Sequence, residues 1–281
     1  MTTTAHSTPQ DAVHLGPDPL RNAAWFVGIT LALAALASIA LIGSGAQPTL
    51  LAFALAFPPA LVAIALAWRE GNGAVGRLFH QLTIRPKNPI WFMALLIPLG
   101  AFLAVDVVAI ASGAATDGMF DDVFPNVLIV PLIVVVPAFA EEIAWRGYAL
   151  PRTLTAISPL RAAIVLGIPW ALIHVPLFLP GQMNGGSSIV SMAAQIVSYS
   201  VILTWVYVGT GVSVLMTGLV HALANGLVPL MNGFDPFLTW DIRGIVFPVV
   251  AILIVALGGF RRLAWSGGAA TPQRLPRRIT T

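Results

Sequence analysis

The sequence predicts an all-α protein that spans a membrane about eight times and encloses a polar cavity. Of the 281 residues, 58% are hydrophobic and only 9% are charged, which excludes an ordinary soluble domain. The apolar residues form long runs, each close to the roughly 20 residues with which an α-helix crosses the hydrocarbon layer. These runs do not alternate between polar and apolar residues, so they predict helices and not a β-barrel.

The apolar runs predict eight spans within one membrane domain, residues 22–265, whose motif-bearing core is 125–231. The spans lie at about 24–44, 49–68, 90–112, 125–150, 160–180, 188–208, 211–231 and 244–262. Residues 1–21 and 266–281 are rich in Thr, Pro, Gly and Arg and have no apolar periodicity. Such composition predicts two disordered cytoplasmic tails.

The basic residues predict how the chain is oriented in the membrane. They are Arg21, Arg69, Arg77, Arg85, Lys87, Arg152, Arg161 and the arginines between 261 and 278. With eight spans these residues fall on one face, and the opposite loops carry acidic residues such as Asp117 and Asp122. Because Lys and Arg mark cytoplasmic loops, we expect a multi-pass protein of the cell membrane with both termini cytoplasmic. The positive charge is spread over short loops, so it indicates contact with membrane lipid and not with nucleic acid.

Two adjacent glutamates, Glu141 and Glu142, lie near the end of an apolar run, where a charged side chain costs roughly 2.5 to 3.5 kcal/mol. Glu142 and Arg146 stand four residues apart on one helix face and are predicted to form an ion pair. Glu141 points about 100° away from Glu142 and lacks that partner. A structural ion pair with a second, interfacial glutamate is the alternative interpretation of this segment.

Two further polar pairs lie on separate spans. Trp170 and His174 stand four residues apart on one span, and His221 and Asn225 do so on another. Taken alone, each pair is typical of a hydrogen-bonded core residue or of contact between helices. Only five histidines occur in the chain, however, and the two within spans lie on helices that cross the same layer as the glutamates. We therefore expect the three segments to meet near the middle of the membrane.

Two imidazoles and a carboxylate on three helices suit hydrolytic chemistry. Glu141, His174 and His221 could hold a divalent metal ion such as Zn²⁺ with an open water position, or could activate water without a metal. Asn225 suits an oxyanion donor, because its amide offers protons without adding charge. Attack of water on a carbonyl is the reaction class that this set predicts. The absence of cysteine excludes a thiol nucleophile and a thiolate metal site.

Several known intramembrane protease motifs are absent from the sequence. No histidine begins His-Glu-x-x-His, and Gly209-Thr210-Gly211 is followed by Val212 and not by aspartate. The segment around Ser44 lacks the first glycine of Gly-x-Ser-Gly. These patterns exclude site-two, presenilin-type and rhomboid-like enzymes.

The three segments together resemble the CAAX protease and bacteriocin-processing family of intramembrane endopeptidases. They read Glu-Glu-x-x-x-Arg at 141–146, aromatic-x-x-x-His at 170–174 and His-x-x-x-Asn at 221–225. The resemblance implies that Glu141 and His174 activate the attacking water, that His221 and Asn225 stabilise the oxyanion, and that Glu142 and Arg146 support them. Trp170 is a departure, because the family usually has phenylalanine there. Members are described both as metalloendopeptidases and as glutamate-dependent endopeptidases, so the resemblance leaves the cofactor open.

The resemblance implies a membrane-associated peptide or protein as the substrate, without indicating whether that substrate is prenylated. Two other functions are compatible with the same residues. A proton-coupled transporter would use the buried Glu, His and Asn as a relay and would extend it through Asp106, Gln195 and Tyr199. A noncatalytic membrane scaffold would keep them as a polar core. The sequence makes no prediction about the oligomeric state.

Overall fold

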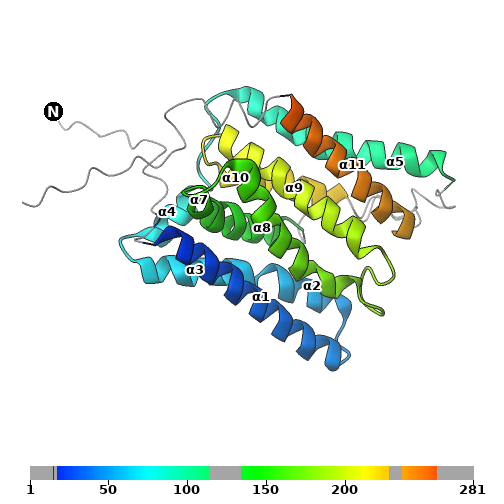
Figure 1. The fold of residues 1–281 in the computed structure, drawn as a ribbon, viewed down its shortest axis with the longest axis horizontal. Helices are drawn as coiled ribbons and strands as arrows, with labels where there is room; N and C mark the ends of the chain where they lie inside the picture. The colour runs from blue at the N-terminus through cyan, green and yellow to red at the C-terminus, as the bar shows by residue number, and fades with distance from the viewer. Residues whose placement is uncertain (1–14, 16–17, 114–133, 228–235, 258–281) are drawn as a thin grey trace, which may run out of the picture.

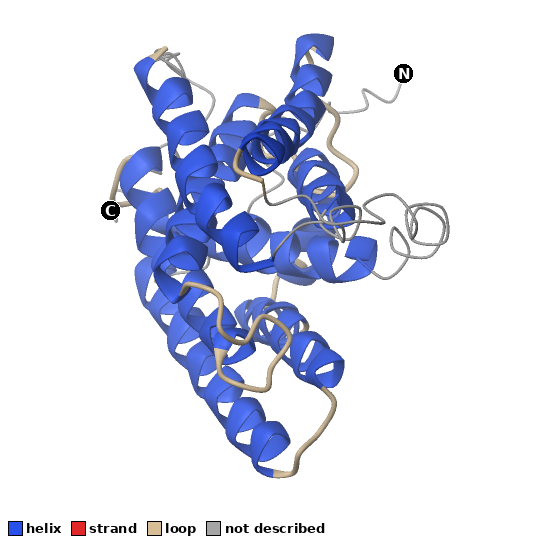
Figure 2. Ribbon diagram, turned by 90° about the vertical axis from the view of Figure 1, so that its right-hand side faces the viewer, coloured by secondary structure: helices blue, strands red, loops and turns tan. Residues whose placement is uncertain are grey.

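The computed structural model describes residue 15 and residues 18–113, 134–227 and 236–257. Every regular element within these ranges is a helix, and they contain no strand (Figure 2). Six helical segments are long and apolar enough to cross a membrane, and a shorter apolar helix covers Val214–Gly226. The predicted all-helical, polytopic fold class is therefore confirmed.

The described elements follow one another along the chain in this order. They are α1 (Pro19–Gly43), α2 (Pro48–Ala56), α3 (Pro58–Glu70), α4 (Ala74–His80), η2 (Pro89–Leu95), α5 (Leu96–Ala111), η3 (Ile143–Ala149), α7 (Leu150–Thr153), α8 (Pro159–His174), η4 (Val175–Phe178), α9 (Ile189–Gly209), α10 (Val214–Leu227) and α11 (Pro236–Ala256). Residues 134–142 are also α-helical and lead directly into η3. Several helices begin with a proline, which is favourable there because the first turn has no use for its missing N–H.

The membrane-spanning segments agree with the predicted spans, with local differences. The second span, Pro48–Glu70, is interrupted at Phe57, because Pro58 cannot donate a hydrogen bond into a continuous helix. The fourth predicted span, 125–150, begins outside the described residues. The N-terminal helix starts at Pro19, inside the range predicted as a tail. The remainder of that predicted tail, apart from residues 15 and 18, and the whole C-terminal tail at 266–281 lie outside the described residues.

Helix α9 lies in the middle of the helical assembly. It packs against α8 on one side and α11 on the other, and α11 packs in turn against α5 (Figure 1). On the α8 side, α1 and α3 contact η3. Large apolar side chains on the outer helices point outward, among them Ile39, Leu103 and Leu253. An outer surface of this kind suits contact with lipid tails, while the polar residues gather inside.

The helix that carries the two glutamates changes its winding directly after them. Residues 134–142 are α-helical, and η3 is a π-helix in which all seven residues are buried. A π-helical segment has a wider turn, with hydrogen bonds between residues five apart, and such segments occur frequently at functional sites. The change begins at Ile143 and includes Arg146.

Candidate active site

Glu141 and Glu142 close the α-helical part of their segment and point to different partners. Their exposed fractions are 6% and 0%, so both carboxylates are buried among other side chains. Glu142 contacts Arg146 and His221, whereas the hydrogen bond of Glu141 comes from Trp170. The predicted divergence of the two side chains is thus found in the structure.

The Glu142 carboxylate joins the first and third motifs. Its Oε1 atom accepts a hydrogen bond from Arg146 Nη1 at 2.9 Å and lies 2.9 Å from His221 Nδ1. The predicted ion pair between Glu142 and Arg146 is therefore present, and both side chains are almost fully buried. The contact between Glu142 and His221 connects this segment to α10. Removal of Arg146 would leave the buried Glu142 carboxylate with an uncompensated charge.

Trp170 is the side chain on which the three motifs meet. Its indole Nε1 donates a hydrogen bond to Glu141 Oε2 at 2.7 Å. Its ring contacts both imidazoles, with centroids 6.1 Å from His174 and 5.5 Å from His221. The Arg146 guanidinium lies 4.4 Å from the centroid of the same ring, in cation–π geometry. One aromatic side chain thus contacts a residue of each motif.

The hydrogen bonds of the two histidines define which ring nitrogen is free. His174 Nδ1 lies 2.7 Å from the carbonyl oxygen of Trp170. A carbonyl oxygen can only accept, so Nδ1 carries the proton and Nε2 keeps its lone pair in the neutral ring. The same reasoning applies to His221, whose Nδ1 faces the Glu142 carboxylate. Each imidazole therefore has an Nε2 atom that its buried partner does not use.

Asn225 lies one helical turn beyond His221 and is half-buried. In the ranges that the structure describes, its amide makes no hydrogen bond to another residue, so its link to the other motif residues rests on its position on α10. Tyr199, on α9, forms a further wall of the site. Its ring lies 5.6 Å from that of His221, and its hydroxyl donates to the carbonyl of Val220 at 2.9 Å.

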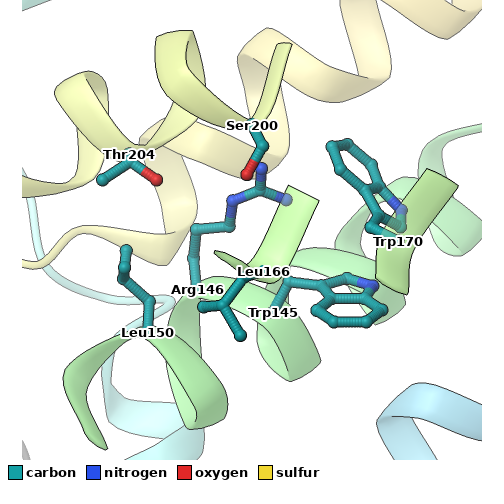
Figure 3. A pocket seen from close by; sticks show the side chains of 7 residues that line it. All are labelled: Trp145, Arg146, Leu150, Leu166, Trp170, Ser200 and Thr204. Atoms are coloured by element: carbon teal, nitrogen blue, oxygen red, sulfur yellow. The ribbon is translucent and has the colours of Figure 1, made fainter. Parts of the chain in front are cut away.

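A narrow pocket surrounds the side chain of Arg146. It is lined by Trp145, Arg146, Leu150, Leu166, Trp170, Ser200 and Thr204 (Figure 3). The space between these side chains is too small for a water molecule, and the guanidinium extends into it between Ser200 and the tryptophans. Arg146 is therefore a packed, supporting residue, and this pocket is no route for a substrate.

The predicted zinc ligands are not arranged as a metal site in this structure. Among residues 18–113, 134–227 and 236–257, no three His, Cys, Asp or Glu side chains are placed to hold one ion. Glu141 Oε2 is engaged by the Trp170 indole, and that ring contacts both imidazoles. The set formed by Glu141, His174 and His221 thus does not fit a metal ion as placed, and zinc binding remains a prediction.

Two supporting side chains were not among the predicted site residues. Thr217 lies beside the Glu142 carboxylate, and Tyr199 packs on His221 and Trp170. A signal for Thr217 exists in the sequence, because it stands four residues before His221 and so shares its helix face. Tyr199 comes from α9, which carries none of the three motifs, and the spacing of the motifs gives no indication of it.

Comparisons with known proteins point to the same family as the three motifs. The family described as type II CAAX prenyl endopeptidase Rce1-like matches residues 123–227, a range that contains all six predicted site residues. A CAAX prenyl protease 2 from Methanococcus maripaludis is 26% identical over 196 residues, which is 64% of this chain and 70% of that protein. The family match covers nearly all of the motif-bearing core, and the match to the relative covers most of the length of the chain.

Proposed function

We propose that the chain is a member of the CAAX protease and bacteriocin-processing family of intramembrane endopeptidases, and that it cleaves a peptide bond with water that Glu141 and His174 activate. The observation that carries this proposal is the meeting of the three motifs on Trp170, which brings a carboxylate and two imidazoles into one cluster. In this proposal the substrate is a membrane-associated peptide or protein. The enzyme itself lies in the membrane with both termini cytoplasmic.

Glu141 is the proposed general base. Trp170 engages its Oε2 atom and leaves Oε1 to accept a proton from water. The Nε2 lone pair of His174 is a second acceptor that can orient the same water molecule. The water oxygen then attacks the carbonyl carbon, and the proton held by Glu141 passes to the leaving amine nitrogen, so that one water molecule is consumed for each bond cleaved.

His221 and Asn225 are the proposed oxyanion donors. For His221 to donate from Nε2, its ring must be protonated at both nitrogens, because Nδ1 already donates to Glu142. The buried Glu142 carboxylate orients the ring through Nδ1, and Arg146 holds that carboxylate in place. The Asn225 amide would supply the second donor. Removal of one such donor typically costs about 10² to 10³ in turnover.

Zinc dependence is a separate part of the proposal. If Glu141, His174 and His221 hold an ion, Glu141 Oε1, which Trp170 does not engage, would be the carboxylate ligand. Elemental analysis of the purified protein tests this directly. Stoichiometric zinc that is lost in His174→Ala supports a metalloendopeptidase, and full cleavage activity in metal-free protein supports the glutamate-dependent form.

The transporter alternative requires a polar path from the site to Asp106. Tyr199 does adjoin His221, but the rings of Phe247 and Phe102 follow it, at 5.6 Å and 5.7 Å between successive centroids. Asp106 instead interacts electrostatically with Arg243. The contacts that lead from His221 to Arg243 thus run through aromatic rings, which favours an enzyme over a continuous proton relay.

The proposed activity is tested with the purified protein in proteoliposomes and a library of membrane-associated peptides. Glu141→Ala, His174→Ala and His221→Ala should each lower the cleavage rate by at least about 10², because each removes a base or an electrostatic contribution. Equal rates for the wild type and all three variants would refute the assignment. Solute flux that depends on the same residues, without cleavage, would favour a transporter.

A further inference from the structure

Gln81 is a buried polar residue that none of the three motifs includes and that lies outside the matched range 123–227. It follows α4 directly, and its exposed fraction is 1%. We propose that Gln81 is a positioning residue for the reaction, which fixes the π-helical turn carrying Arg146. This inference rests on the proposed function, because a positioning residue needs a reaction to serve.

Gln81 supplies a hydrogen-bond donor to a backbone carbonyl of the π-helix. Each residue added by a π-turn leaves a backbone carbonyl without its usual α-helical partner, and a buried carbonyl without a partner is costly. Gln81 Nε2 donates a hydrogen bond to the carbonyl oxygen of Gly147 at 3.0 Å. This carbonyl belongs to the residue directly after Arg146, within η3. The side chain of Gln81 thus stabilises the wide turn at the point where the arginine emerges.

A second bond orients the Gln81 amide. The Tyr207 hydroxyl, from α9, donates to Gln81 Oε1 at 2.8 Å. Since a carbonyl only accepts and this hydroxyl donates here, the amide nitrogen must face Gly147 and the amide oxygen must face Tyr207. Tyr207 itself is fully buried, so its hydroxyl has no water to replace Gln81.

The main chain of Gln81 connects the same point to the third motif. The backbone N–H of Val214 donates to the Gln81 carbonyl at 3.1 Å. Val214 is the first residue of α10, the helix that carries His221. Gln81 therefore links three elements, η3, α9 and α10, and two of them hold the residues that meet on Glu142.

The packing around Gly147 is tight. A Cβ atom at this position would lie 3.1 Å from Leu78 Cδ1, 3.4 Å from Val214 Cγ2 and 3.7 Å from Gln81 Nε2. The glycine thus permits the close approach of the segment around Gln81. Without the Gln81 bond the turn can relax toward an α-helix, which would rotate Arg146 relative to Glu142 and release the support of His221.

The test compares Gln81→Leu with Thr210→Val in the full-length protein. Thr210 is a matched control, because its buried hydroxyl also bonds at the end of α9 but only to carbonyls of its own helix. In Gln81→Leu we expect kcat to fall about tenfold with KM within about twofold, and hydrogen exchange of residues 143–149 to accelerate about tenfold. Thr210→Val should leave all three quantities close to wild type.

A second variant, Tyr207→Phe, covers the case in which Gln81→Leu does not fold. It keeps the bond from Gln81 to Gly147 and removes only the hydroxyl that orients the amide. We therefore expect kcat to fall about threefold, less than in Gln81→Leu. An unchanged kcat in folded Gln81→Leu, or in Tyr207→Phe if Gln81→Leu cannot be purified, would overturn the proposal. An equal loss in Thr210→Val would do the same.

Failure of the proposed function is recognised separately. If the wild type cleaves no peptide, the endopeptidase proposal fails, whereas the exchange measurement still reports on the π-helical turn. Unchanged exchange of residues 143–149 in Gln81→Leu would then refute the positioning role on its own.

Discussion

Two buried glutamate–arginine pairs differ in how completely their hydrogen bonds are used. In the first pair, Glu70 on α3 binds Arg152 on α7, and both side chains are buried. Glu70 Oε1 also accepts hydrogen bonds from Asn22 on α1 and from the Tyr148 hydroxyl on η3, each at 2.8 Å. The carboxylate therefore has partners on both oxygens and joins four elements.

The second pair, Glu142 and Arg146, is incomplete. A single oxygen, Glu142 Oε1, receives the bonds from Arg146 and His221. Glu142 Oε2 and Arg146 Nη2 are buried, and neither has a hydrogen-bond partner among the residues that the structure describes. Buried polar groups are usually satisfied, so these two atoms call for an explanation, and they belong to the pair that contacts His221.

The comparison sets an ion pair with complete hydrogen bonding beside one that we propose serves the reaction. Saturated bonding at Glu70 holds helices together, whereas Glu142 supports a histidine that has a free ring nitrogen. Both pairs consist of a glutamate and an arginine, so residue type alone does not distinguish them in the sequence. Substitutions at the two glutamates should therefore affect different quantities.

Glu70→Gln should produce the largest loss of stability. The substitution keeps the size of the side chain but leaves Arg152 buried without its counter-charge, which costs about 3 to 5 kcal/mol of unfolding free energy. Cleavage activity per folded molecule should stay within about twofold of wild type, because Glu70 contacts none of the predicted site residues. Denaturant titration in detergent, with activity assayed on the folded fraction, measures both.

The control for Glu70→Gln is Arg21→Gln, which breaks an exposed pair with Asp18. Exposed pairs contribute little, so the unfolding free energy should change by less than about 1 kcal/mol. Comparable losses in the two variants would mean that the Glu70 cluster has no special structural role.

Glu142→Gln should lower the cleavage activity per folded molecule, unlike Glu70→Gln. Arg146 again loses a buried counter-charge, but here the folded fraction should also lose activity by about 10², because the His221 ring loses the carboxylate that orients it. The rate per folded molecule is the quantity to compare with Glu70→Gln. If the two variants kept the same activity per folded molecule, the distinction between the pairs would be wrong.

Trp170→Phe should have a smaller effect. Phenylalanine keeps the aromatic wall but cannot donate to Glu141, so the carboxylate loses the bond that orients it. We expect kcat to fall about tenfold with little change in KM. Trp170→Leu is the matched variant that removes the wall as well, and it should lose more. An unchanged kcat in Trp170→Phe would show that the indole N–H has no orienting role.

Local spacing in the sequence was sufficient to predict the helical fold, the three motifs and the pairing of Glu142 with Arg146. These features depend on residues within a few positions of one another, which helical geometry brings together. The interruption at Phe57 had a visible cause in Pro58 and Pro59, yet hydropathy alone joined the two helices into one span.

Other features depend on contacts that spacing cannot indicate. Gln81 meets Gly147 across 66 positions of the chain, and the π-helical winding of η3 has no characteristic residue pattern. The bond from Trp170 to Glu141 depends on how both side chains are packed. For the same reason, residue types that suggested a zinc site did not reveal that the indole occupies one carboxylate oxygen.

The most direct test of the proposed chemistry is a single turnover in ¹⁸O-labelled water, followed by mass spectrometry of the peptide product and of the protein. If Glu141 activates water for direct attack, the new carboxylate of the product carries one ¹⁸O atom and Glu141 carries none. Label in Glu141, with an unlabelled product, would show that the glutamate itself attacks the substrate and would contradict this mechanism.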